Sequence, residues 1–323
     1  MGNTRIRMAA TLAVSTLLLA ACGGQDTNTE PAASGSGGAA ASGSVRVDGS
    51  STVAPLTAAA KELFNATPDG EGIDITVGQS GTGGGFKKFC AGETDISDAS
   101  RSIKDEEAAI CAEAGIEYAE IAVANDALTL IVNNENDWAK CLTVEELKTM
   151  WAPESENTIT NWNQINPSFP DVPLELFGAG TDSGTFDYFT DAINGEEGAS
   201  RTDYTPSEDD NITLTGVEGT KGALGYLGFS YFEENADKVK AVEVDGGSGC
   251  VAPSLETASD GTYTPLSRPL FIYPSKSAMQ RPEVASFVEF YVTNDAEITS
   301  KALFVPLSAA QQEEAKAALA TLQ

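Results

Sequence analysis

Three short segments carry the residue types that hold small anions in proteins. They are residues 48–52 (DGSST), 79–85 (QSGTGGG) and 178–185 (GAGTDSGT), and each lies between an apolar run and a segment with helical spacing. The first N–H groups of a helix have no partner within it, and that end carries about half a positive charge. Glycine lets an anion approach those groups, and hydroxyls add further donors. One such turn is ordinary helix capping, but three together predict a site for one small tetrahedral oxyanion.

Arg101 is the cation that best fits such a site. It ends the block at residues 95–101 (DISDASR), in a sequence with few basic residues. A guanidinium can bind two oxygens of an oxyanion at once. The alternative is a surface arginine paired with Asp98 or Asp105.

Catalytic groups are scarce, and the sequence contains no histidine. Ser183 therefore has no imidazole to activate it as a nucleophile. The glycines at 78–85 lack the order of an NTPase phosphate-binding loop, and the acids at 208–210 lack the spacing of a calcium loop. We expect a protein that is not an enzyme and that uses no cofactor and no metal.

The charge of the chain restricts its partners. The sequence has 48 acidic and 19 basic residues, which gives a formal net charge of −29 at pH 7. So acidic a surface repels the phosphates of DNA and RNA. We expect no nucleic-acid partner.

A strand, a small-residue turn and a helix follow one another three times, which is typical of an α/β fold. The three strands are expected at 45–47, 73–77 and 174–177. In α/β folds the turns that follow strands lie at one end of the sheet, where ligands bind. An apolar stretch at 121–132 and a strand at 270–273 could cross between two lobes.

The N-terminal segment has the features of an export signal. Residues 1–21 contain two arginines and then an apolar run that is shorter than the about 20 residues needed to span a bilayer. Leu19-Ala20-Ala21-Cys22 is similar to a bacterial lipobox, in which Cys22 is acylated, with palmitate among the expected acyl groups, and becomes the new N-terminus. The alternative is a plain secretory signal with an incidental cysteine. Residues 22–44 are nearly all small or polar, which predicts a flexible tether.

Four further cysteines, an even number in an exported chain, favour disulfides. Four cysteines allow three pairings. We expect Cys90 with Cys111, which closes a short loop, and Cys141 with Cys250, which could lie within one lobe.

Four blocks together resemble PstS, the family of phosphate-binding proteins of high-affinity phosphate ABC importers. The blocks are DGSSTVAP from Asp48, QSGTGGGF from Gln79, DISDASR from Asp95 and GTDSGTF from Gly180. Their order and spacing match over nearly all of residues 45–323. The resemblance implies a two-lobed periplasmic-binding-protein fold of type II, in which hinge strands let the lobes close on dehydrated phosphate.

The length of the folded part also favours two lobes, because a single core stops growing at about 250–300 residues. We expect residues 45–126 and 267–323 to form lobe 1 and residues 127–266 to form lobe 2.

The resemblance also implies the residues that bind phosphate from the three turns. They are Ser51 and Thr52, Ser80 and Thr82, and Ser183, Gly184 and Thr185. Two departures point to an SphX-like branch of the family: Ser100 stands where the best-known branch has an aspartate, and Ala179 stands where it has an arginine. We expect Arg101 to replace the guanidinium and Asp182 to supply the carboxylate.

The resemblance implies a monomeric receptor, lipid-anchored on the outer (periplasmic or cell-wall) face of the cell membrane, that hands phosphate to the membrane subunits of an ABC permease. Alternatives are a binding protein for another oxyanion such as sulfate, an extracellular phosphohydrolase, or an adhesin that keeps the fold.

Overall fold

The computed structural model describes residues 43–181 and 183–323. The predicted signal segment 1–21, Cys22 and most of the predicted tether lie outside the described residues. Within the described part of the chain, no helix combines the length and the apolar character needed to cross a membrane.

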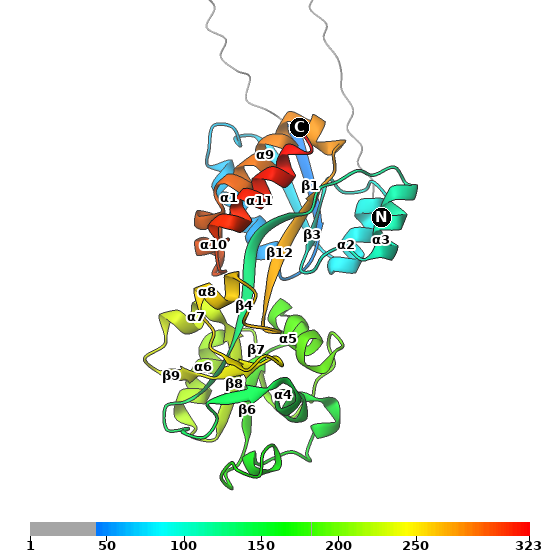
Figure 1. The fold of residues 1–323 in the computed structure, drawn as a ribbon. Coiled ribbons are helices and arrows are strands. Elements are labelled where there is room, and N and C mark those ends of the chain that lie inside the picture. Colours follow the sequence, from blue (N-terminus) through cyan, green and yellow to red (C-terminus); the bar gives the residue numbers. More distant parts are fainter. Residues whose placement is uncertain (1–42, 182) are drawn as a thin grey trace, which may run out of the picture. The chain divides into compact units, whose positions relative to one another are not determined.

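One mixed sheet runs through the described body in the order β2-β1-β3-β12-β4-β8-β6-β7, with β9 also paired to β4 (Figure 1). Its strands are β1 (Gly43–Gly49), β2 (Ile73–Gln79), β3 (Ile96–Ala99), β4 (Ile121–Asn133), β6 (Glu175–Ala179), β7 (Thr205–Ser207), β8 (Ala223–Gly228), β9 (Val239–Ala241) and β12 (Ser267–Pro274). A small second sheet has the order β11-β10-β5, with β5 (Cys141–Thr143), β10 (Glu243–Asp245) and β11 (Cys250–Val251).

Helices cover these sheets, which confirms the predicted α/β class. They are α1 (Ala54–Asn65), α2 (Thr82–Cys90), α3 (Asp105–Glu113), α4 (Val144–Trp151), α5 (Gly184–Asn194), α6 (Asp210–Gly219), α7 (Phe229–Glu234), α8 (Leu255–Ser259), α9 (Pro282–Thr293), α10 (Asp295–Ala302) and α11 (Ala309–Ala320). Short 3-10 turns lie at Pro153–Ser155, Trp162–Gln164 and Ala278–Gln280.

β1 begins two residues before the expected start of the folded body at Val45. Its first residues pair in parallel with the start of β2, so the end of the predicted tether belongs to a strand. On its other side β1 pairs in parallel with β3, so the three turns that follow these strands share one end of the sheet.

The two largest hydrophobic clusters meet along β4. One holds residues from both ends of the described chain, such as Val45, Ala124 and Phe287, and the other holds middle residues such as Leu128 and Trp162. Two cores on one sheet give the body its two lobes.

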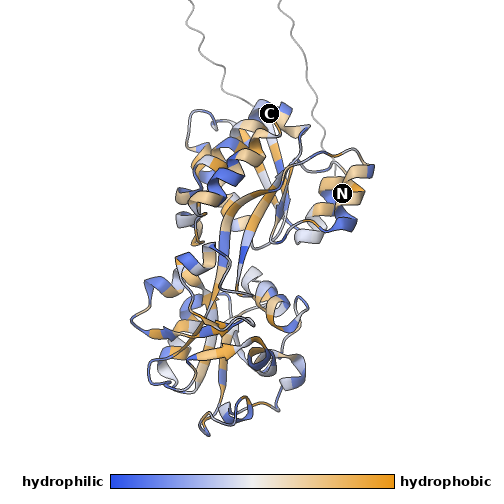
Figure 2. Ribbon diagram, in the orientation of Figure 1, coloured by the Kyte–Doolittle hydropathy of each residue, from blue (hydrophilic) through white to orange (hydrophobic). Residues whose placement is uncertain are grey.

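Strands β4 and β12 connect the two cores. They pair antiparallel with each other, as the predicted crossing strands should, and Arg268 lies opposite Asp126 in the register. Both strands turn hydrophilic between the two cores (Figure 2), where β4 carries Asn125 and Asp126. These polar residues therefore lie between the two cores, where neither core requires an apolar side chain.

The second glycine turn differs from the expectation. α2 begins at Thr82, so Gly83, Gly84 and Gly85 form its first turn instead of a loop before it. Close packing requires glycine within this turn, because a Cβ on Gly85 would lie 2.5 Å from the Cα of Gly49. Gly81, with a φ of 74°, makes the entry into the helix.

Both predicted disulfides are present. Cys90 and Cys111 join α2 to α3, with 4.4 Å between their Cα atoms. Cys141 and Cys250 join the outer strands of the small sheet, with 6.0 Å between their Cα atoms.

Candidate functional site

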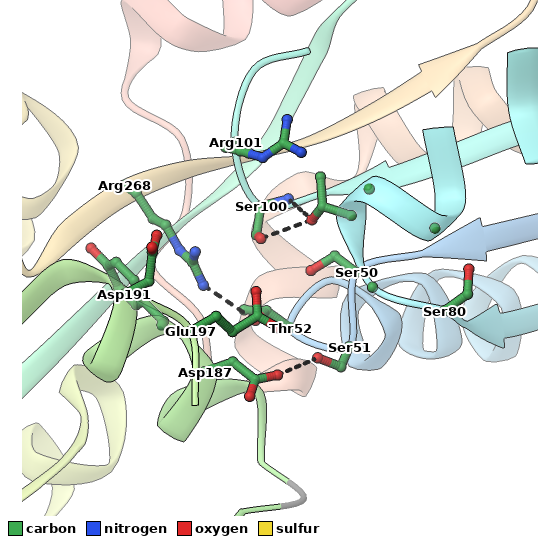
Figure 3. Close-up of a pocket in the computed structure, with 15 residues that line it drawn as sticks. Ser50, Ser51, Thr52, Ser80, Ser100, Arg101, Asp187, Asp191, Glu197 and Arg268 are labelled. Atoms are coloured by element: carbon green, nitrogen blue, oxygen red, sulfur yellow. Dashed lines mark hydrogen bonds between the residues drawn. The ribbon is translucent and has the colours of Figure 1, made fainter. Parts of the chain in front are cut away.

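A cavity of about 250 Å³ lies between the turns that follow β1, β2 and β3 on one side and α5 and β12 on the other (Figure 3). It is lined by Ser50, Ser51, Thr52, Ser80, Gly81, Thr82, Gly83, Gly84, Ser100, Arg101, Asp187, Tyr188, Asp191, Glu197 and Arg268. The first two predicted turns and the Ser100-Arg101 pair therefore come together. The described residues of the third turn do not line the cavity.

The first turn faces helix α5. The Ser51 hydroxyl donates to the Asp187 carboxylate at 3.5 Å, and the Thr52 hydroxyl donates to the Gly184 carbonyl at 3.3 Å. The Ser50 N–H donates to the Asp98 carbonyl at 2.9 Å, which holds the turn against β3. The turn thus presents its hydroxyls to the second lobe.

The second turn contacts the end of β3. The Thr82 and Ser100 hydroxyls lie 3.0 Å apart, and the Ser100 N–H donates to the Thr82 oxygen at 3.2 Å. The hydroxyls of Thr82 and Ser100, which come from different turns, therefore lie side by side at the cavity.

Ser80 is arranged differently from Thr82, although both line the cavity. Its hydroxyl donates to Asp48, which also accepts from Lys88 at 2.6 Å. Burial raises the pKa of Asp48, but the hydrogen bonds from Lys88 and Ser80 outweigh it and lower that pKa overall. The Ser80 proton is therefore directed at a buried carboxylate, which leaves the oxygen of Ser80 as the atom available to a ligand.

Arg101 lies at the cavity in a two-point ion pair with Glu107. Nη1 donates to Oε2 at 2.8 Å, and Nη2 donates to Oε1 at 2.9 Å. The hydrogen bond to Glu107 is the largest effect on the guanidinium and raises its pKa. The partner is neither Asp98 nor Asp105, because Glu107 in the first turn of α3 also accepts from the Lys104 N–H and is held facing Arg101.

The third turn caps α5. The Ser183 hydroxyl accepts from the Thr185 N–H at 3.1 Å, and Thr185 lines a neighbouring cavity. Gly184 packs tightly on the first turn, since a Cβ there would lie 2.7 Å from the Thr52 hydroxyl oxygen. Asp182, the predicted carboxylate, lies outside the described residues. Further along α5, Asp187 and Asp191, which are one helical turn apart, reach the cavity.

Arg268 of β12 is a site residue that sequence reasoning missed. It points from the crossing strand toward Thr52 (Figure 3), and its Nη2 donates to the Thr52 hydroxyl oxygen at 3.2 Å. The same atom lies 3.4 Å from Asp126 Oδ2. The guanidinium carbon lies 3.5 Å from the centre of the Tyr188 ring, a cation–π contact. Its signal in the sequence was a scarce arginine two residues before the strand expected to cross back.

Carboxylates line the second-lobe side of the cavity. They are Asp187 and Asp191 on α5 and Glu197 beyond its end. Burial is the largest effect on Asp187 and raises its pKa, and the nearby charge of Glu197 raises it further against the lowering by Ser51 and Arg268. An ionised carboxylate here can accept a hydrogen bond from an anion that carries a proton. It repels an anion that has no proton to donate.

In chemical terms, the cavity combines hydroxyl and guanidinium donors with carboxylate acceptors. The donors suit the oxygens of a small oxyanion, and the acceptors suit a hydroxyl on the same anion.

The chain is similar to known binding proteins over most of its length. A model of the PBP superfamily domain matches residues 34–295. Protein SphX of Synechocystis sp. is 49% identical over 82% of this chain and 78% of its own length. The phosphate-binding protein PstS of Staphylococcus epidermidis is 36% identical over 90% of this chain and 85% of its own. The crystal structure of a possible phosphate binding protein from Planctomyces limnophilus matches with a TM-score of 0.81 and 46% identity, over 87% of this chain and 99% of that one.

Proposed function

Since this chain belongs to the PBP superfamily, and within it to the family of SphX and the phosphate-binding protein PstS, we propose that it captures inorganic phosphate outside the cytoplasm for an ABC importer. The observation that carries the proposal is the cavity between the lobes, where hydroxyls of two turns meet two guanidinium groups. The protein binds and releases phosphate without chemical change.

Phosphate would lie among the donors of the first lobe. Ser51, Thr52, Thr82, Ser100 and Arg101 would donate to its oxygens, and Ser80 would accept from its hydroxyl, since all six line one cavity. We propose that Ser183, Gly184 and Thr185 join them only when the lobes close further, because these residues begin α5 but do not line the cavity.

The division into lobes follows the two hydrophobic cores. We propose residues 45–126 with 267–323 as lobe 1 and residues 127–266 as lobe 2, which is consistent with the change of core along β4. Bending of β4 and β12 at their hydrophilic segment would open and close the site, as in other hinged binding proteins.

We propose that Cys22 carries the lipid anchor and that the protein is a monomer that delivers phosphate to the permease subunits. A Cys22→Ala variant should leave the membrane fraction, and gel filtration of the purified protein should give the mass of one chain. Retention of the variant in the membrane would contradict the anchor.

Titration calorimetry of the purified protein with phosphate and with sulfate tests the main proposal. We expect tight binding of phosphate and no binding of sulfate at the same concentration. Preference for sulfate would make the protein a receptor for another oxyanion. Release of phosphate from a phosphate ester in a colorimetric assay would identify a phosphohydrolase, and binding of neither anion would refute the proposal.

A further inference from the structure

We propose that Arg268 is the guanidinium that ion-pairs the bound oxyanion and that Arg101 has a secondary role. This assignment rests on the proposed function, because it names a further binding residue of the same site. It follows from how the charges of the two arginines are compensated.

The charge of Arg101 is already compensated. Both of its terminal nitrogens donate to the two oxygens of Glu107, and Nη1 also donates to the Ser102 carbonyl at 3.1 Å. An arginine and a carboxylate in this two-point geometry match each other's hydrogen-bonding groups. Arg101 therefore offers an anion only its remaining N–H groups and little net charge.

Arg268 is compensated much less. Among the described residues its one ion pair is with Asp126, through a single pair of atoms at 3.4 Å, beyond ordinary charge-assisted hydrogen-bond distance. Its Nε is buried and has no hydrogen-bond partner among the described residues. A buried N–H without a partner is costly, so a ligand oxygen at this position would remove that cost.

Asp126 is buried beside Arg268. The residue is 6% exposed, and burial raises the pKa of its carboxyl more than the charge of Arg268 lowers it. The single long contact with Asp126 leaves the buried Nε of Arg268 free to donate to an anion in the cavity.

The surroundings hold the guanidinium in one plane. The Tyr188 ring covers one face, and its hydroxyl donates to the Pro265 carbonyl at 2.8 Å, which fixes the ring. Arg268 lies on crossing strand β12. It contacts Thr52, on the side of the first core, and Tyr188, on the side of the second core. An oxyanion bound to Arg268 would therefore contact both sides of the site.

Phosphate titrations of four variants test this assignment. We expect Arg268→Gln to weaken phosphate binding about 100-fold and Arg268→Lys about tenfold, because lysine keeps the charge and loses the planar fork. The matched control is Arg46→Gln, which removes one charge from an exposed arginine paired with Asp95. We expect its affinity to equal that of the unsubstituted protein.

A double variant separates binding from a structural role. Arg268→Gln leaves Asp126 buried without its cation, so this variant should also be less stable in thermal unfolding without phosphate. Arg268→Gln combined with Asp126→Asn should recover that stability and still bind phosphate about 100-fold more weakly. Recovery of binding in the double variant, or unchanged binding in Arg268→Gln, would overturn the assignment to Arg268 and leave the proposed function standing. If the unsubstituted protein bound no phosphate, the proposed function would fail first.

Discussion

Arg101 and Glu107 form a two-point ion pair at the edge of the cavity, with distances of 2.8 and 2.9 Å between their paired atoms. Glu107 thereby orients the guanidinium and also sets a negative charge behind it. These two effects act on phosphate in opposite directions, and a single substitution separates them.

We predict that Glu107→Gln tightens phosphate binding about two- to fivefold. Glutamine keeps an oxygen that can accept from Arg101 but removes the charge that repels the anion, and near a protein surface such a charge is worth on the order of 1 kcal/mol. Calorimetry at low salt measures the change. Glu117→Gln is the control, because it removes one acidic charge from an exposed pair with Lys276. Weaker binding in Glu107→Gln would show that orientation of Arg101 matters more than the charge.

Discrimination between phosphate and sulfate should depend on Asp187. Phosphate near neutral pH keeps a proton that sulfate lacks, so a carboxylate in the cavity can accept from phosphate and only repels sulfate. We predict that Asp187→Asn lowers the ratio of phosphate to sulfate affinity at least about tenfold, through weaker phosphate and stronger sulfate binding.

The same titrations on Asp182→Asn form the comparison, since Asp182 is the carboxylate that the sequence favours. A loss of discrimination confined to Asp182→Asn would assign the role to Asp182 and contradict the assignment to Asp187.

The free energy of unfolding should decrease as pH rises, because of Asp98. This residue is fully buried below the site, and burial raises its pKa to about 7, with Thr57 lowering it and Asp48 raising it. From about pH 4 to 7 the folded protein keeps a proton that the unfolded chain has lost, so this group lowers the free energy of unfolding as pH rises through that range and adds nothing further above it.

We predict that Asp98→Asn removes this pH-dependent decrease in the free energy of unfolding. Relative to the unsubstituted protein, the variant should gain about 2–3 kcal/mol in free energy of unfolding between pH 5 and pH 8. Urea unfolding at both pH values measures the difference. Parallel pH profiles of the two proteins would mean that Asp98 titrates normally.

The Cys141–Cys250 disulfide should stabilise the second lobe. It closes a loop of 109 residues and joins the strands on either side of β10. The loop-entropy relation predicts a loss of about 5 kcal/mol on its removal, against about 3 kcal/mol for the 21-residue separation of Cys90 and Cys111. Thermal unfolding of Cys141→Ser/Cys250→Ser, with the other disulfide intact, measures the loss. An unchanged melting temperature would contradict the prediction.

The sequence alone determined the α/β class, the crossing strands, both disulfides and six of the fifteen residues that line the cavity. The class and the strands follow from patterns of neighbouring residues, and the two pairings from an even number of cysteines of which two close a short loop. Ser51, Thr82 and Ser100 each follow a strand, and the ends of parallel strands meet at one edge of a sheet. Motifs of this kind are short, so their residue types could be read before the fold was known.

Only the tertiary structure decided which charges face the ligand. Asp187 lies 136 positions from Ser51, and Arg268 lies 216 positions from Thr52, so no local pattern links them. Their approach depends on the packing of α5 and on the register of β12 with β4. The partner of Arg101 was likewise decided by the orientation of α3, which presents Glu107 in place of the nearer Asp105. Side-chain contacts between distant elements follow from the three-dimensional packing of the cores, and that is why the sequence predicted the hydroxyls of this site and missed its second arginine.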